Sequence, residues 1–115
     1  MIPFKLDITE KNNSPSIRIE GELDIHHCAQ LDDALSPLLS KNPTHIFFNL
    51  LNTSYIDSTG LGVIANAARN VAKHNGQIIL ISDKSQLKKV LELSGLHKKN
   101  VTLVENEKAA EKFYA

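Results

Sequence analysis

The sequence predicts a single α/β domain, residues 1–115, built on a small mixed β-sheet packed with about four helices. Strand-like and helix-like segments alternate along the chain, and residues 77–81 form an apolar run typical of a parallel strand covered on both faces. Hydrophobic residues make up 42% and charged residues 23%, close to the globular average. The predicted element order is β-β-α-β-α-β-α-β-α, with right-handed crossovers between parallel strands.

The first two strands are expected on either side of a break at residues 12–15. Apolar residues alternate with polar ones on both sides of this break: Phe4, Leu6 and Ile8 before it, and Ile17, Ile19 and Gly21 after it. Alternation with a period of two indicates half-buried strands. The two strands should therefore pair as an antiparallel hairpin.

A helix should follow Asp24, which is the expected N-cap. One helical face carries the apolar residues Ala29, Leu31, Ala34, Leu35 and Leu38. Pro37 interrupts this pattern and should end the helix or bend its last turn.

The second half of the chain repeats the strand-helix pattern. Residues 45–50 read as a buried strand, residues 52–56 as a loop and residues 61–75 as a helix that stops at Asn75-Gly76. After the strand at 77–81, residues 82–85 should open a third helix. This helix should carry Leu87, Val90, Leu91 and Leu93 on one face and close at Ser94-Gly95. A short strand at 101–104 and a helix at 107–114 complete the chain.

The most informative motif is Asp57-Ser58-Thr59-Gly60-Leu61-Gly62, which lies between a predicted strand and a predicted helix. Aspartate, serine and threonine favour helix N-caps because their side-chain oxygens accept hydrogen bonds from free backbone N–H groups. A hydroxyl at this position is exposed at the positive end of the helix dipole, where a phosphate is favourable. The motif therefore indicates a phosphorylation switch, or simply a helix cap.

Acidic residues at a second loop could join this motif. Glu22 and Asp24 follow the second strand, and Asp57, Ser58 and Thr59 follow the third. If these strands are parallel neighbours, their carboxyl ends lie at one edge of the sheet, where functional groups of such folds gather. The alternative for Glu22 and Asp24 is ordinary turn and cap chemistry.

Several function classes find no support in the sequence. Ser58 lacks the hydrolase elbow Gly-x-Ser-x-Gly, and Gly60-Leu61-Gly62 is neither a P-loop nor a dinucleotide fingerprint, so we expect no enzyme and no cofactor. The His26-His27 doublet has no further ligand at a suitable spacing, so no metal site is expected. The formal net charge of zero argues against a general attraction to nucleic acid or anionic membrane.

The sequence also bears on the cellular compartment. No run approaches the roughly 18 apolar residues of a membrane span, and the N-terminus lacks the apolar stretch of a signal peptide. Cys28 is the only cysteine, so an internal disulfide is impossible. We expect a cytoplasmic protein.

Three motifs together resemble the STAS domain of bacterial anti-sigma factor antagonists. These are Gly21-Glu22-Leu23-Asp24, the motif at 57–62, and Ser94-Gly95-Leu96, which match in order and spacing over essentially the whole chain. The resemblance implies that Ser58 is phosphorylated by a partner serine kinase of the GHKL type, the anti-sigma factor, and dephosphorylated by a PP2C-like phosphatase. Thr59 is the alternative acceptor.

The resemblance further implies a partner-switching cycle. The unphosphorylated protein, a monomer when free, would bind the kinase and release a sigma factor, and phosphorylation would end the binding. The expected partner-binding residues are Glu22, Asp24, Asp57, Ser58, Thr59, Gly60 and Leu61. The alternative is a STAS subunit that packs constitutively on a larger partner, in a phospholipid-transport or stress-sensing complex.

Overall fold

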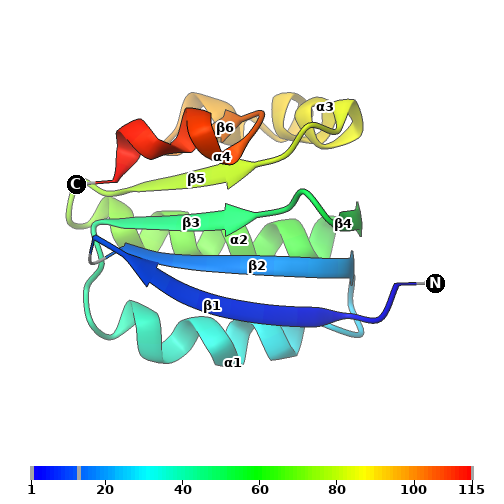
Figure 1. The fold of residues 1–115 in the computed structure, drawn as a ribbon, viewed down its shortest axis with the longest axis horizontal. Coiled ribbons are helices and arrows are strands. Elements are labelled where there is room, and N and C mark those ends of the chain that lie inside the picture. Colours follow the sequence, from blue (N-terminus) through cyan, green and yellow to red (C-terminus); the bar gives the residue numbers. More distant parts are fainter. Residues whose placement is uncertain (1, 13, 115) are drawn as a thin grey trace.

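The computed structural model describes residues 2–12 and 14–114 and shows a mixed sheet with helices on both faces (Figure 1). Strands β1 (Lys5–Lys11) and β2 (Ser14–Leu23) form the predicted antiparallel hairpin, in which Ile8 pairs with Ile17. Strands β3 (His45–Asn49), β5 (Gln77–Ile81) and β6 (Val101–Val104) continue the sheet in the order β1-β2-β3-β5-β6. The pairs β2-β3, β3-β5 and β5-β6 are parallel, which confirms the predicted mixed α/β class.

The prediction of a loop at residues 52–56 was wrong, because Thr53–Ile56 form a further strand, β4. Strand β2 is ten residues long, and β3 pairs only with its residues Ser16–Arg18. The last residues of β2 pair instead with β4, where Glu22 lies opposite Tyr55. The side chain of Thr53 fixes this junction, since its hydroxyl donates to the carbonyl of Ile19 at 2.8 Å. The resulting element order therefore departs from the predicted one by a second strand before the second helix.

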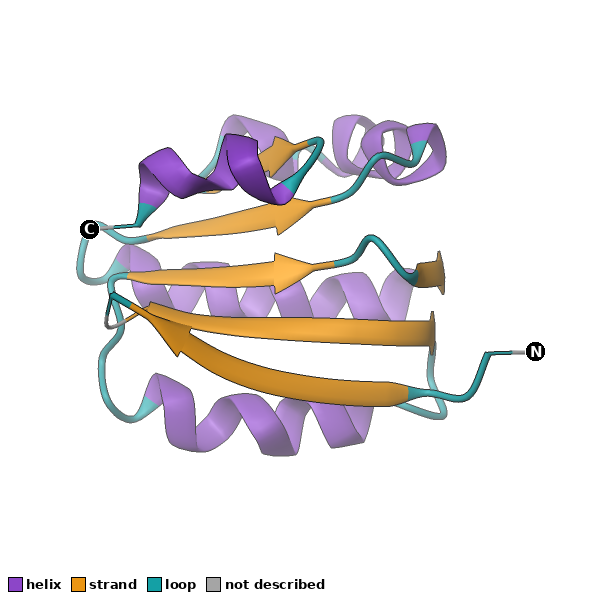
Figure 2. Cartoon of the chain, in the orientation of Figure 1, coloured by secondary structure: helices purple, strands orange, loops and turns teal. Residues whose placement is uncertain are grey.

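Four α-helices lie in the described part of the chain (Figure 2). Their bounds are Cys28–Leu39 for α1, Ser58–Ala72 for α2, Ser85–Ser94 for α3 and Glu107–Ala110 for α4. Helix α2 begins three residues before the predicted start at Leu61, because Asp57 is its N-cap. The predicted helix at 107–114 is divided into α4 and a 3-10 turn at Glu111–Phe113. A further 3-10 turn, Leu96–Lys98, follows α3.

The predicted cap of α1 was also wrong, because the cap position belongs to His27 rather than to Asp24. The Asp24 carboxylate instead accepts from the backbone N–H of His26 at 3.0 Å, and the Asp24 carbonyl accepts from His27 N and Cys28 N. Asp24 thus forms a side-chain turn of its own before the helix, as short acidic residues often do. Pro37 lies in the last turn of α1, which ends at Leu39, in agreement with the predicted end.

A tight turn separates α2 from β5. Asn75 takes the left-handed conformation, with φ of 58°, and the N–H of Gly76 donates to the carbonyl of Val71 at 2.8 Å. A Cβ atom at Gly76 would lie 1.8 Å from the carbonyl oxygen of Thr44, so only glycine fits there. The predicted stop at Asn75-Gly76 is therefore present, although the helix itself already ends at Ala72.

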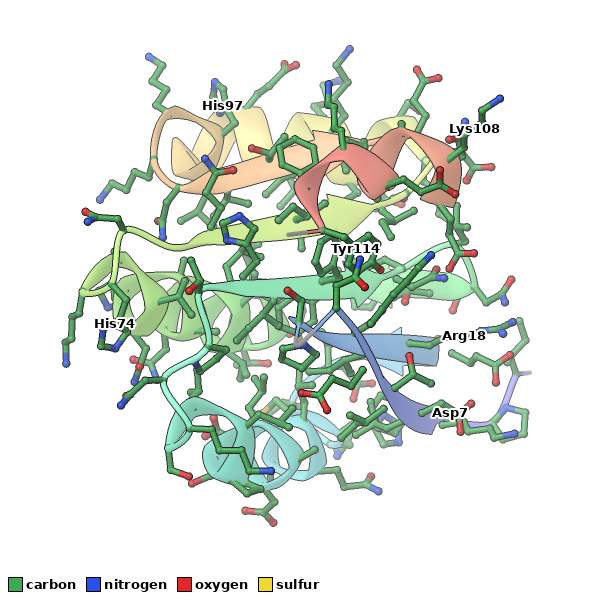
Figure 3. All side chains as sticks on the ribbon, turned by 60° about the vertical axis from the view of Figure 1, so that its left-hand side comes forward. Asp7, Arg18, His74, His97, Lys108 and Tyr114 are labelled. Carbon is green, nitrogen blue, oxygen red and sulfur yellow. The ribbon has the colours of Figure 1, made fainter. Side chains whose placement is uncertain are left out.

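The main core lies between the sheet and helices α1, α2 and α3, and it includes Leu31, Ile64 and Leu91, one from each helix. A smaller core on the opposite face packs Phe47, Ile79 and Ile81 beneath Ala110 of α4. Next to it, the ring of Tyr114 stacks on Phe47 with centroids 4.0 Å apart. Figure 3 shows this C-terminal part together with β1 and β2. Because β2 and β4 are parallel neighbours, their carboxyl ends lie at the same edge of the sheet (Figure 1).

Candidate functional site

The loop after β2 and the turn after β4 meet at this edge, which brings the two predicted groups of residues together. The parallel pairing of Leu23 with Ile56 sets the relative position of the loop after β2 and the turn after β4. Beyond it, the N–H of Asp57 donates to the carbonyl of Leu23 at 3.3 Å. The expectation that the two loops are neighbours is therefore confirmed, although β4 rather than β3 supplies the adjacent strand.

The carboxylate of Asp57 holds the site together. Its Oδ1 accepts from the N–H of Gly60 at 3.0 Å, as an N-cap side chain does, and from the hydroxyl of Thr59 at 2.5 Å. Its Oδ2 accepts from the N–H of Ile25 at 3.1 Å. The hydrogen bond from the Thr59 hydroxyl, followed by that from Gly60, lowers the pKa of Asp57, and partial burial opposes them. The carboxylate is therefore ionised near neutral pH.

Ser58 is the first residue of α2 and is exposed. Its hydroxyl is not one of the donors that Asp57 binds, in contrast to the hydroxyl of Thr59. The first turn of α2 contains no acidic side chain. An exposed hydroxyl therefore lies at the positive end of the helix dipole.

Gly60 allows the close approach of α2 to β2. A Cβ atom at this position would lie 2.5 Å from the carbonyl oxygen of Leu23 and 2.8 Å from its Cγ atom. Gly62 has no neighbour within 4 Å of such an atom, so the two glycines of the motif differ in their structural role. Leu61 is half-buried and packs against the main core, which anchors the helix behind Ser58.

The two acidic residues after β2 have different surroundings. Glu22 is exposed; it pairs with Tyr55 in the sheet, and its backbone carbonyl lies 2.9 Å from Nδ1 of His27. Asp24 Oδ1 lies 3.0 Å from the same Nδ1 atom, and the His27 ring stacks on Phe4 with centroids 4.2 Å apart. Asp24 thus organises the loop, whereas the Glu22 side chain is exposed to solvent.

Two exposed apolar residues at this edge were not among the predicted site residues. The side chain of Ile25 is 63% exposed, although its N–H is held by Asp57. Tyr55, the neighbour of Glu22 in the sheet, is 44% exposed. Large apolar side chains gathered at a surface are a feature of protein interfaces. We call Glu22, Ile25, Tyr55, Ser58 and Thr59 the switch face.

Within residues 2–12 and 14–114, no three His, Cys, Asp or Glu side chains form a group that could hold a metal ion. In the same part of the chain, no helix is both long enough and apolar enough to cross a membrane.

Comparison with protein families finds a match to the STAS domain model over residues 5–110. The chain is 25% identical over 93 residues to the anti-sigma-B factor antagonist of Staphylococcus aureus (strain NCTC 8325 / PS 47), covering 81% of this chain and 86% of that protein. It is 25% identical over 80 residues to the anti-sigma-B factor antagonist of Staphylococcus epidermidis, covering 70% and 74%.

Solved structures show the same likeness. The Bacillus cell fate determinant SpoIIAA in its phosphorylated form is 27% identical, with a TM-score of 0.74 and coverage of 96% of this chain and 99% of that one. The anti-sigma factor antagonist SpoIIAA in its unphosphorylated form gives a TM-score of 0.77 at 24% identity, covering 96% and 97%. An anti-sigma factor antagonist from Mycobacterium paratuberculosis has a TM-score of 0.85 at 17% identity, covering 97% and 94%, and supports the fold alone.

Proposed function

Because this chain belongs to the STAS domain family, whose model it matches over residues 5–110, we propose that it is an anti-sigma factor antagonist controlled by phosphorylation of Ser58. The unphosphorylated protein binds an anti-sigma factor that is also a serine kinase of the GHKL type, and this binding frees a sigma factor. The likeness to anti-sigma-B factor antagonists and to SpoIIAA supports the general class.

The observation that carries the proposal is the position of Ser58. It is an exposed hydroxyl on the first residue of α2, directly after a capping aspartate. It shares one edge of the sheet with the exposed side chains of Ile25 and Tyr55. A kinase that docks on the switch face would therefore meet an acceptor that needs no unfolding to react.

The covalent step is a phosphoryl transfer from ATP bound to the kinase. The Ser58 oxygen forms a bond to the γ-phosphorus, the bond between that phosphorus and the β,γ-bridging oxygen breaks, ADP leaves, and the hydroxyl proton passes to a base of the kinase. A PP2C-like phosphatase reverses the step by hydrolysis, which consumes water and releases inorganic phosphate. In this cycle the protein is a substrate and not a catalyst.

Phosphorylation ends the binding by changing the charge of the switch face. A phosphate adds about −1.5 to −2 charges at pH 7 next to the ionised Asp57 and near Glu22. Charge that is buried at an interface without compensation costs several kcal/mol. The fold tolerates the same phosphate, because the start of a helix favours an anion.

The remaining expectations follow from this role. The protein acts in the cytoplasm, is a monomer when free, and needs neither a cofactor nor a nucleic acid. Its surface contacts with the kinase come from the switch face together with Asp24, Asp57, Gly60 and Leu61, of which Gly60 is buried and contributes through the position of α2.

A capture and phosphorylation experiment tests the proposal. Affinity-tagged protein should recover a GHKL kinase from native extract of its source organism, and that kinase with ATP should add one phosphate, located at Ser58 by mass spectrometry. Ser58→Ala should remove the phosphate. Ser85→Ala is the matched control, because Ser85 is also exposed on the first residue of a helix but follows Lys84, which gives no side-chain cap. Phosphate on Ser85 or Ser94 alone, or ATP hydrolysis by the protein without a kinase, would contradict the proposal.

A further inference from the structure

Two neighbouring hydroxyls stand at the start of α2, and only one of them is engaged by Asp57. Thr59 Oγ1 donates to Asp57 Oδ1 at 2.5 Å. The exposed Ser58 does not bond to this carboxylate, whose other donors are the N–H groups of Gly60 and Ile25. Composition alone does not distinguish the two acceptors, because serine and threonine both carry a hydroxyl that can be phosphorylated.

We propose that Asp57 determines which hydroxyl is phosphorylated, by withholding Thr59 from the kinase and leaving Ser58 as the acceptor. This inference rests on the proposed function and adds a specificity-determining residue to it. The role of Asp57 then extends beyond its cap of α2.

Hydrogen bonds fix the Asp57 carboxylate, and with it the hydroxyl of Thr59. The Asp57 carboxylate cannot rotate to follow the Thr59 hydroxyl, because its two oxygens accept backbone hydrogen bonds. The N–H of Gly60 donates to Oδ1 at 3.0 Å, and the N–H of Ile25 donates to Oδ2 at 3.1 Å. A Thr59 hydroxyl that turned toward a kinase would therefore have to leave its partner. Hydrogen bonds to an ionised acceptor are about twice as strong as those between neutral groups, so this loss opposes the reaction at Thr59.

The fate of the hydroxyl proton also disfavours phosphorylation of Thr59. Transfer to either residue forms an oxygen–phosphorus bond, breaks the bond to ADP and releases the hydroxyl proton. The Thr59 hydroxyl donates this proton to Asp57 in a hydrogen bond, and Asp57 could act as a base only by taking the proton. The lowered pKa of Asp57 makes this carboxylate a poor base. The hydrogen bond therefore restrains Thr59 rather than activating it.

The phosphorylated product is also less favourable at Thr59 than at Ser58. Phosphothreonine at 59 would replace a hydrogen-bond donor by about −1.5 to −2 charges, next to the carboxylate oxygen that the donor served. Like charges at this distance repel strongly, and the ester oxygen that replaces the hydroxyl has no proton to donate to Asp57. Phosphoserine at 58 leaves the hydrogen bond between Thr59 and Asp57 intact.

A kinase assay in a Ser58→Ala background tests the inference. With kinase and ATP, the single variant should incorporate little phosphate, and Ser58→Ala with Asp57→Asn should phosphorylate Thr59 at least about tenfold faster. Asparagine is chosen because it caps helices as well as aspartate but carries no charge. Thr59 phosphorylation in the single variant at the wild-type rate for Ser58 would overturn the inference. Absence of phosphate from the wild-type protein would instead contradict the proposed function.

A second measurement needs no kinase. Protein with phosphoserine incorporated at 58 during translation should melt close to the unmodified protein, and protein with phosphothreonine at 59 should melt lower by about 4 °C or more. Asp57→Asn should recover most of that loss at 59 and change little at 58. Equal melting temperatures for the two phosphoproteins, or no recovery with Asp57→Asn, would refute the role of Asp57 even if the double variant is not phosphorylated.

Discussion

Asp57 and Ile25 are joined by a hydrogen bond of 3.1 Å, from the backbone N–H of Ile25 to Oδ2 of Asp57. The two residues are 32 positions apart, one in the loop after β2 and the other at the cap of α2. This contact fixes the exposed side chain of Ile25 on the same edge of the sheet as Ser58. The backbone of the loop after β2 is therefore tied to the start of α2.

The pKa of Asp57 should depend on Thr59. We expect a value below the usual aspartate value of about 3.9, and Thr59→Val should raise it by removing the first cause of the shift. Because the pKa of Asp57 is lower in the folded protein than in the unfolded chain, the ionised carboxylate stabilises the fold at pH values above the unfolded pKa. This stabilisation is lost as the pH falls through the folded pKa. The loss of stability between neutral pH and pH 3 should therefore be smaller in Thr59→Val. Carboxyl NMR titration checks the pKa, and an unchanged Asp57 pKa in the variant would show that the hydrogen bond is absent.

The two glycines of the motif should respond oppositely to alanine. Gly60→Ala should destabilise the fold by about 1–3 kcal/mol, because its Cβ would lie 2.5 Å from the carbonyl of Leu23. Gly62→Ala has free space in the same helix and should stabilise it by up to about 1 kcal/mol. Urea unfolding of both variants measures the difference, and equal effects would argue against the close contact of α2 with β2.

Ile25→Thr should weaken kinase binding at least about fivefold, since an apolar side chain that becomes buried in an interface contributes about 1 kcal/mol or more when it is a main contact. Ile8→Thr is the matched control, because Ile8 is 45% exposed and pairs with Ile17 in the other half of β2. Calorimetric titration with the kinase gives both affinities. A similar loss in the two variants would remove Ile25 from the switch face.

Glu22→Ala should reduce affinity for the kinase with little change in stability, because the Glu22 side chain is exposed. Asp24→Ala should lower both, since Asp24 also holds the N–H of His26. Thermal melts alongside the titrations separate the two effects. Glu92→Ala, at an exposed position of α3, serves as the control. If Glu22→Ala binds as well as Glu92→Ala does, Glu22 has no part in docking.

Local periodicity was sufficient to predict most of the sheet but not β4. The strand Gln77–Ile81 and the strand Val101–Val104 have the predicted bounds, because each is a continuous apolar or β-branched run. Thr53–Ile56 is as short as Val101–Val104, but its residues Thr-Ser-Tyr-Ile form neither an apolar run nor an alternation of apolar and polar residues. It is a strand because residues 21–23 of β2 have no partner in β3, and this requirement arises only once the sheet has formed.

Helical spacing predicted where the helices lie along the chain better than it predicted which of their residues face the core. Leu87 and Leu91 are buried as predicted, but Leu93 is 84% exposed, so its assignment to the same face was wrong. Two residues correspond to about 200° around a helix, which turns Leu93 away from Leu91. The sheet beneath α3 covers only the side that carries Leu87 and Leu91.

The motif at 57–62 predicted a helix cap with an exposed hydroxyl at Ser58, because cap chemistry is local, but it did not single out Asp57 among its three capping residues. The exposure of Ile25 and Tyr55 depends on what packs against them, and no short-range pattern encodes this. The bond between Asp57 and Ile25 depends on the pairing of β2 with β4, so it too could not be predicted without that strand.

The most direct test of the account is the affinity of the kinase for the unphosphorylated protein and for the protein phosphorylated at Ser58, measured by calorimetric titration. A coupling of about 3 kcal/mol corresponds to more than a hundredfold. We predict at least this loss of affinity on phosphorylation, with an unchanged circular-dichroism spectrum. Equal affinities for the two forms, or loss of the folded spectrum on phosphorylation, would contradict the switch at Ser58.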